Sequence, residues 1–144
     1  MDLNPLTNLG DVQPENIDTG PIVVLNLLKF KSEQSVSGYL DYVAEFFSHF
    51  GSKGAEVLYA GRLEEQVQGD IGNWDAIALV RYPSRRVFYE MIRSDEYQSF
   101  SHLRENALDN AVLWPSETLM PYKTQTVEFE GGDWLQEIQS RLAK

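Results

Sequence analysis

One amide in the sequence stands in apolar surroundings where its chemistry needs a partner. Asn26 interrupts the apolar run PIVVLNLLKF at residues 21–30. A buried amide without hydrogen bonds costs roughly 1–3 kcal/mol, so this side chain must bond to something. If Asn26 faces a cleft, it can orient a ligand carbonyl. If it does not, it is a structural amide bonded to neighbouring backbone or to a buried water, and the sequence leaves both readings open.

Arg104 is a second polar group in such surroundings. It shares one side of a predicted helix with Phe100, Leu108 and Ala111 at helical spacing. A guanidinium on an apolar stripe needs an anion, which either a ligand carboxylate or a protein carboxylate such as Asp75 could supply. Because the chain holds 22 acidic residues, we favour the protein partner.

Two large rings bracket one predicted strand. Trp74 and Tyr82 share a face of that strand, with Ala76, Ala78 and Val80 between them. Small residues between two rings leave the room that a pocket floor needs. The alternative is that the alanines receive bulky helix side chains in ordinary core packing, and such packing is the commoner outcome.

Tyrosine and histidine side chains complete the candidate site. Tyr42 and Tyr97, with Tyr39 nearby, lie on helix faces expected to approach the cleft, where a hydroxyl could donate to a bound anion or enolate. His102 is a candidate general base if its helix turns it inward. The structural alternatives are a tyrosine bonded to backbone or water and a histidine at the surface.

Composition narrows the classes of partner. A formal net charge of −10 disfavours nucleic acid and anionic membranes, because their phosphates would be repelled. The chain has no cysteine and only two histidines, so we expect neither disulfides nor a metal site, and no cofactor. No apolar run approaches the roughly 20 residues that span a bilayer, and the N-terminus lacks the pattern of a signal peptide. We therefore expect a cytoplasmic protein.

The order of predicted elements indicates the fold that must position these residues. We expect a single domain over 1–144, with an arm at 1–20, a core at 21–124, and an extension at 125–144 that ends in a short helix. The core reads as strand, helix, strand, strand, helix, strand. Their predicted extents are a strand at 21–30, a helix ending near Phe50, strands at 55–70 and 73–82, helical segments from 85 to about 112 with a break at 94–97, and an edge strand at 114–122. This β-α-β-β-α-β order predicts an α+β, ferredoxin-like split βαβ fold with both helices on one face of an antiparallel sheet.

Such a sheet leaves its second face to be covered. The run at 21–30 is apolar on both faces, and two helices cover only one. The simplest cover is the same face of a second subunit, which predicts a two-fold homodimer. The C-terminal helix could fold back over that face instead, although it is short. We expect Asp75 and Arg81 to point toward this face and to join its rim.

Three stretches of the chain resemble the DUF1330 family of small proteins of unknown function. They are PIVVLNLLKF, GNWDAIALVRYPSRRVFYEMIRSDEY and HLRENAL, and the likeness covers roughly residues 2 to 122. The resemblance implies a dimeric α+β barrel, in agreement with the split βαβ order. It implies no established activity, and the tail from about residue 125 lies outside it.

A more distant likeness is to cofactor-poor monooxygenases and haem-degrading enzymes on the same dimeric barrel. The haem-degrading group uses an Asn on its first strand, a Trp near the end of its third and a His on its second helix. Asn26 matches the first position, but Tyr82 and Ser101 stand at the other two, with His102 one residue off. One residue rotates a helical side chain by about 100°, so His102 should not inherit the ligand role.

Two hypotheses for function follow. In the first, the protein binds a small organic acid in a cleft between helices and sheet, either as a binding module or as a cofactor-independent enzyme of monooxygenase-like or proton-transfer type. Its predicted catalytic residues are His102 and Tyr82, and its predicted ligand-binding residues are Asn26, Trp74, Arg104, Tyr42 and Tyr97. In the second, the protein is a non-catalytic dimerisation or ligand-sensing module in which these groups only complete the core.

Overall fold

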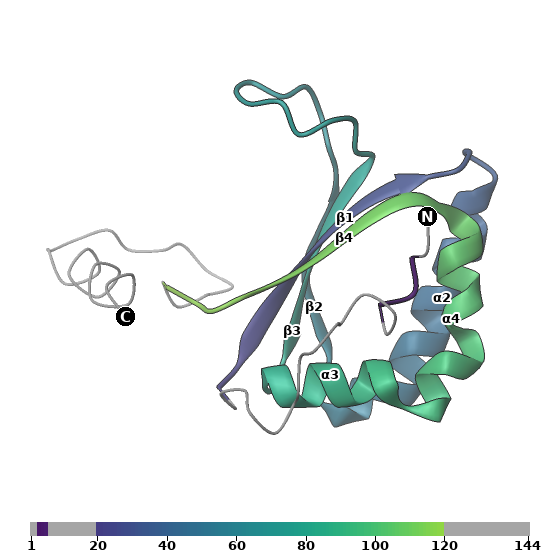
Figure 1. The fold of residues 1–144 in the computed structure, drawn as a ribbon, viewed down its shortest axis with the longest axis vertical. Coiled ribbons are helices and arrows are strands. Elements are labelled where there is room, and N and C mark those ends of the chain that lie inside the picture. Colours follow the sequence, from purple (N-terminus) through teal and green to yellow (C-terminus); the bar gives the residue numbers. More distant parts are fainter. Residues whose placement is uncertain (1–2, 6–19, 120–144) are drawn as a thin grey trace, which may run out of the picture.

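The computed structural model describes residues 3–5 and 20–119, and their elements form one antiparallel sheet with helices on one side (Figure 1). The elements are β1 (Ile22–Phe30), α2 (Ser35–Phe50), the short 3-10 helix η2 (Gly51–Lys53), β2 (Glu56–Arg62), β3 (Ala76–Tyr82), α3 (Arg85–Arg93), α4 (Asp95–Ala107) and β4 (Leu108–Ser116). The strand order is β2-β3-β1-β4. This is the ferredoxin-like split βαβ arrangement, so the predicted fold class is confirmed. The sheet is open, with β2 and β4 at its two edges.

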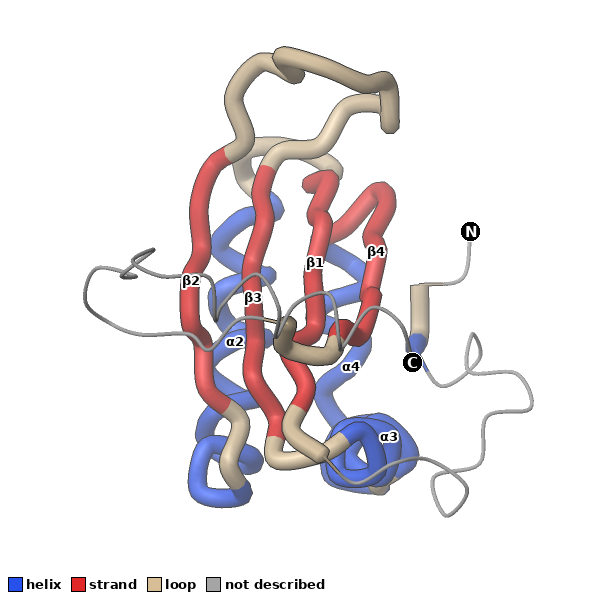
Figure 2. Tube along the Cα trace, turned by 90° about the vertical axis from the view of Figure 1, so that its left-hand side faces the viewer, coloured by secondary structure: helices blue, strands red, loops and turns tan. Residues whose placement is uncertain are grey.

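The helices all lie behind one face of the sheet (Figure 2). Along β1 the even-numbered residues from Ile22 to Leu28 are buried beneath them, and the odd-numbered residues are half-buried on the other face. This alternation follows from the two-residue period of a strand. It places Asn26 on the helix-covered side.

Serine caps set the starts of the two helices after β3. The Ser84 hydroxyl accepts from the backbone N–H of Val87 at 3.0 Å, and the Ser94 hydroxyl accepts from that of Tyr97 at 3.1 Å. Each bond satisfies an amide that the first helical turn leaves free. The predicted break between two helical segments is confirmed, and it lies at Ser94.

The boundary between the last helix and the last strand was predicted wrongly. The helical pattern continued to about residue 112, but α4 ends at Ala107 and β4 begins at Leu108. Antiparallel pairing with β1 along almost the whole length of β4 overrides the local helical spacing. Pro115 lies in this strand, and the edge position that we expected for it is confirmed. The strand predicted at 55–70 is also shorter, since β2 ends at Arg62.

Part of the predicted organisation lies outside the described residues. This holds for most of the arm at 1–20 and for the extension at 125–144 with its short helix. Residues 3–5 are described and contact α4, where the Asn4 side-chain amide donates to Gln98 at 2.9 Å. Among the described residues, no helix is both long and apolar enough to cross a membrane.

Candidate functional site

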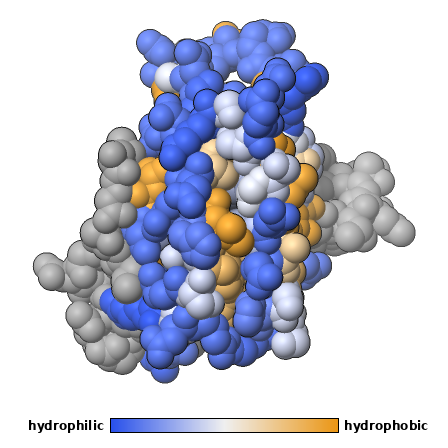
Figure 3. All heavy atoms as spheres, turned by 90° about the vertical axis from the view of Figure 1, so that its right-hand side faces the viewer, coloured by the Kyte–Doolittle hydropathy of each residue, from blue (hydrophilic) through white to orange (hydrophobic). Residues whose placement is uncertain are grey.

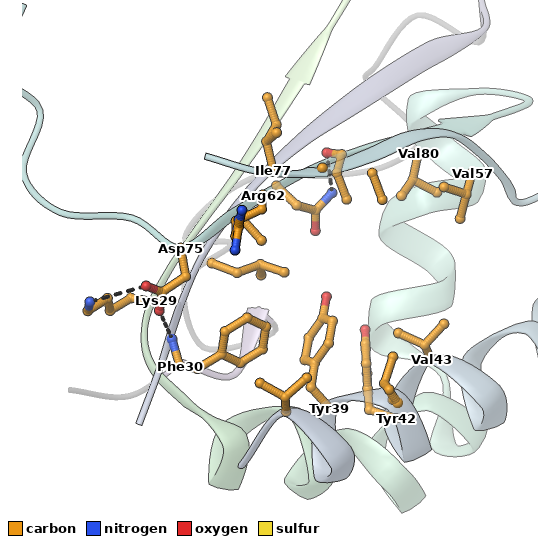
Figure 4. A pocket seen from close by; sticks show the side chains of 18 of the residues that line it. Lys29, Phe30, Tyr39, Tyr42, Val43, Val57, Arg62, Asp75, Ile77 and Val80 are labelled. Atoms are coloured by element: carbon orange, nitrogen blue, oxygen red, sulfur yellow. Dashed lines mark hydrogen bonds and ion pairs between the residues drawn. The ribbon is translucent and has the colours of Figure 1, made fainter. Parts of the chain in front are cut away.

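A cavity of about 1020 Å³ lies between α2 and the part of the sheet formed by β1, β2 and β3 (Figure 4). Its sheet side includes four small residues, Ala60, Gly61, Ala76 and Ala78. Its helix side carries larger side chains, namely Val36, Tyr39, Leu40, Tyr42, Val43, Phe46 and Phe47. A wall of small side chains opposite a helix leaves space, which is the reason this half of the layer is hollow.

Asn26 lies in the wall of this cavity, with 8 % of its surface exposed. Its Nδ2 donates to the carbonyl oxygens of Val24, at 3.2 Å, and Ala78, at 3.4 Å. Both partners are acceptors, so they fix the amide with its NH2 group toward the backbone. Within residues 3–5 and 20–119, no group is found to donate to Oδ1. The amide is therefore anchored structurally through its nitrogen and keeps an acceptor for a ligand.

Three tyrosines contribute the remaining polar groups of the inner wall. Tyr39 and Tyr42 extend from α2 toward the sheet, and Tyr82 comes from the end of β3 (Figure 4). The Tyr42 hydroxyl also lies 3.1 Å from that of Tyr97 on α4, so Tyr42 belongs both to the cavity wall and to a buried hydroxyl pair. Tyr97 itself does not line the cavity.

Burial keeps these phenols protonated. Desolvation is the largest cause for each of them: it raises the pKa of Tyr39 to about 12 and raises the pKa values of Tyr42, Tyr82 and Tyr97 above the ordinary tyrosine value. The positive charge of Arg104 acts in the opposite direction on all four. At neutral pH the tyrosines are hydrogen-bond donors, so Tyr82 can orient an oxygen but cannot serve as an ionised base.

Arg104 is buried near these tyrosines with only 2 % of its surface exposed. Its Nη1 donates to the backbone carbonyl of Leu3 at 2.9 Å, and its Nη2 is buried without a hydrogen-bond partner. No ion pair links it to a carboxylate in the described part of the chain. The protein carboxylate that we favoured as its partner is not found among the described residues, and Asp75, the example suggested, pairs with Lys29 instead. Arg104 does not line the cavity.

Asp75 lies at one end of the cavity instead (Figure 4). Its carboxylate accepts from the backbone N–H of Phe30 at 2.8 Å and from Lys29 Nζ at 3.3 Å. The sequence had placed it on the opposite face by strand alternation. The backbone of Asp75 continues the pairing of β3 with β1, since its N–H donates to the carbonyl of Leu28 at 2.8 Å, and its side chain lies at the strand end beside Lys29. The only sequence feature that could have indicated the location of Asp75 at the cavity end is a short acidic side chain next to a strand.

Two further predicted residues, besides Arg104 and Tyr97, do not line the cavity. Trp74 precedes β3 and donates its Nε1 to the carbonyl of Ile71 at 2.8 Å, so it stabilises its own loop. His102 is exposed on α4 and is not part of the cavity wall. Seen from the helix side, the surface is mainly hydrophilic, with a narrow hydrophobic band (Figure 3).

The site that results is an apolar chamber with one strip of polar groups. The strip supplies phenolic donors and one amide acceptor, and the lining also includes charged side chains, namely Lys29, Lys31, Glu33, Arg62, Asp75 and Asp109. Within the described ranges, no group of three His, Cys, Asp or Glu side chains is arranged to hold a metal ion. Such a chamber can hold a small organic molecule and orient its oxygen atoms.

Comparison with solved structures supports the fold. A protein of unknown function from Rhodopseudomonas palustris, RPA0582, is 27 % identical, with 74 % of this chain and 88 % of that chain covered and a TM-score of 0.66. Hydroxynitrile lyase from Passiflora edulis is 13 % identical over 74 % of this chain and all of its own, with a TM-score of 0.55. A Bacteroides thetaiotaomicron protein classed by name with the antibiotic biosynthesis monooxygenases is 16 % identical over 79 % of this chain and 100 % of that chain, with a TM-score of 0.53. The last two show a shared fold only.

The sequence itself matches one family. The profile of the domain of unknown function DUF1330 matches residues 24–114, which is more than half of the chain, whereas no curated protein matches. The chain therefore belongs to the DUF1330 family, as the sequence resemblance indicated. The matched region includes all the strands that line the cavity.

Proposed function

We propose that this member of the DUF1330 family binds a small organic acid in the cavity between α2 and the sheet. The observation that carries the proposal is the cavity of about 1020 Å³, mainly apolar but with hydroxyls of Tyr39, Tyr42 and Tyr82 and the amide of Asn26 on its wall. The apolar wall would cover the body of the ligand, and the polar strip would orient its oxygens. All three phenols are donors at neutral pH, which suits an acceptor such as a carbonyl or carboxylate.

Binding and orientation are favoured over proton abstraction as the first activity to test. The predicted general base, His102, is exposed outside the cavity. The tyrosines hold their protons, and the Asp75 carboxylate at the cavity end already accepts from Lys29 and from the amide of Phe30. A donor-lined chamber could still stabilise an enolate formed from a bound acid, so catalysis remains a consequence to test once a ligand is found.

Thermal unfolding with benzoate, phenylacetate and octanoate tests the proposal. A ligand that binds only the folded protein raises its apparent stability by mass action, by about 2.7 kcal/mol at a hundred times its Kd. We expect at least one acid to raise the melting temperature of the parent protein. The variant Ala78→Leu, which places a large side chain on the cavity floor, should lose this response.

The control is Leu79→Met in the same strand, which alters the opposite face of the sheet and should keep the response. If no acid stabilises the parent, or if Ala78→Leu responds as the parent does, the cavity is not the binding site for these acids. The non-catalytic dimerisation module would then be the better description.

We also propose that a second copy of the chain covers the open face of the sheet. The pairing register sets Tyr59, Leu79, Leu25 and Trp114 in one row across all four strands. Trp114 is 66 % exposed and Tyr59 is also exposed, so this row presents apolar surface to solvent in a single copy. Sedimentation should give twice the mass of one chain. Leu25→Asp should shift the mass to that of one chain, and an unchanged mass would contradict the proposal.

A further inference from the structure

Arg104 is a buried cation whose hydrogen bonding is incomplete. Only 2 % of its surface is exposed, and one of its terminal nitrogens, Nη2, has no partner. The other, Nη1, donates to the neutral carbonyl of Leu3 at 2.9 Å. Buried polar groups are nearly always bonded, and a buried cation carries a larger penalty than a neutral group when it lacks an acceptor.

The described chain offers this guanidinium no counter-charge. None of the ion pairs found within residues 3–5 and 20–119 involves Arg104. The closest acidic neighbour in sequence, Glu105, has its own buried oxygen without a partner and makes no ion pair with Arg104. A buried charge without a compensating partner is destabilising, so a fold that only needed packing at this position would not require arginine.

The surroundings of Arg104 connect it to the cavity. Its charge acts on Tyr39, Tyr42 and Tyr82, which line the cavity, and on Tyr97, which does not. Tyr97 and Arg104 are seven residues apart and both buried, and they therefore share a face of α4. The hydroxyl pair of Tyr97 and Tyr42 joins this face to the cavity wall. A cation and a set of phenolic donors thus converge on one buried region.

We propose that Arg104, which does not line the cavity while the hydroxyls of Tyr42 and Tyr97 are paired, is its charge-selecting residue: when that pair separates, the carboxylate of a bound acid supplies the acceptor that Arg104 Nη2 lacks. The inference rests on the proposed function and makes it specific: the ligand is an anion, and neutral molecules of the same shape are rejected. The Nη1 bond to Leu3 holds the guanidinium in place. The hydroxyls of Tyr42 and Tyr97 donate to the second carboxylate oxygen, so their mutual bond opens when the acid binds.

Matched probes of equal shape test the selection of charge. Benzoate and benzamide differ at one group, an anionic carboxylate against a neutral amide. We expect the parent to bind benzoate about 10- to 100-fold more tightly than benzamide, because hydrogen bonds to charged groups are the stronger ones. In Arg104→Met the two should bind within about threefold of one another. The control Arg81→Met removes the same charge from the opposite face of the sheet and should keep the preference for benzoate.

Formate separates this inference from the proposed function. It is the smallest carboxylate and needs none of the space that a larger acid occupies over the cavity floor. We expect formate to raise the melting temperature of the parent and of Ala78→Leu, but not that of Arg104→Met. Without any anion, Arg104→Met should melt about 2–4 °C above the parent, because the unsatisfied buried charge is gone.

Each outcome supports or overturns one of the two proposals. Loss of benzoate binding in Ala78→Leu together with retained formate protection supports both. Retained preference for benzoate in Arg104→Met, or absence of formate protection in the parent, overturns the role of Arg104 and leaves the cavity proposal intact. Formate protection without any benzoate binding overturns the cavity proposal, and with it the selection of cavity ligands by Arg104, and leaves only an anion site at Arg104. An Arg104→Met variant that melts well below the parent in the absence of anions identifies a structural arginine and overturns the inference.

Discussion

The layer between helices and sheet is filled on one side and hollow on the other. Under α3 and α4 it is packed with buried side chains, among them Phe88, Met91, Ile92 and Phe100. Under α2 it holds the cavity. The helices do not explain the difference, because α2 is itself rich in aromatic residues. The sheet does: Ala60, Ala76 and Ala78 lie under α2, whereas larger residues such as Leu108 and Leu113 belong to the strand nearer α4.

This comparison separates stability from function within one small core. A filled layer contributes free energy of folding through burial and close contacts. A hollow layer gives up part of that contribution and gains space for a ligand. The same type of substitution should therefore change the free energy of unfolding by different amounts on the two sides, and paired variants can measure this.

The largest difference is expected for a leucine truncated on each side. Leu108, at the junction of α4 and β4, is 1 % exposed, and Leu40, at the cavity side of α2, is 60 % exposed. Leu108→Ala should lower the free energy of unfolding by about 2–5 kcal/mol, and Leu40→Ala by less than about 0.5 kcal/mol. Urea unfolding of both variants measures the two values. Similar losses would mean that the two sides are equally packed.

Alkaline pH should weaken the tyrosine-lined centre next. Burial raises the folded-state pKa of Tyr39 to about 12 from the ordinary value of 10.0, and raises that of Tyr42 as well. The folded protein therefore favours the neutral phenols. This contribution is complete below the unfolded pKa and is lost as the pH rises through the folded pKa, so stability should fall between about pH 10 and 12.

Denaturant midpoints measured across that window test the effect. In Tyr39→Phe the fall should be shallower, since one of the raised phenols is gone. The exposed Tyr59 provides the control, because Tyr59→Phe should leave the pH dependence as it is in the parent. An equal slope in all three proteins would mean that burial of Tyr39 does not control this dependence.

A smaller change in stability is expected when one alanine on the filled side and one on the cavity side are each replaced by leucine. Ala107 is buried at the end of α4, and Ala78 lies on the cavity floor. Ala107→Leu should cost about 1–3 kcal/mol by overpacking, whereas Ala78→Leu should be close to neutral because space is present. Thermal unfolding of the two ligand-free variants gives the comparison. A large loss for Ala78→Leu would mean that the cavity floor cannot accept a side chain.

The smallest expected change in the free energy of unfolding comes from the contact between the hollow side of the layer, under α2, and the filled side, under α4. The Tyr42 and Tyr97 hydroxyls, 3.1 Å apart, join α2 to α4. Tyr42→Phe and Tyr97→Phe should each cost about 1 kcal/mol, and the double variant should cost less than their sum because both remove one bond. A double-mutant cycle at equilibrium measures the coupling. Strict additivity would show that the hydroxyl pair does not couple the two helices.

Much of the fold could be predicted from local pattern. The apolar run around Asn26, the helical stripe that ends at Phe50 and the serine caps at Ser84 and Ser94 each indicate their element within a few residues. The start of β4 at Leu108 could not be predicted in this way, because pairing with β1 decides it. Local spacing reports what a segment would do alone, and a strand partner comes from elsewhere in the chain.

The sequence predicted which types of side chain would form the site better than it predicted where the fold would place each of them. The sequence identified Asn26, Tyr42 and Tyr82 as polar groups in apolar surroundings, and these line the cavity. It could not exclude Trp74, because the strand begins after that residue, nor His102, because helical rotation alone does not say which face meets the sheet. Such choices depend on how elements pack.

The sequence by itself determined which elements form, their order, and which side chains would need a partner. Those properties follow from periodicity, capping and the cost of burying polar groups, all of which act within a few residues. Only the tertiary structure decided that the hollow lies under α2, that Asp75 bonds to Lys29, and that Arg104 lacks a carboxylate. These are relations between segments distant in sequence, and only the packing of helices on the sheet brings them within bonding distance.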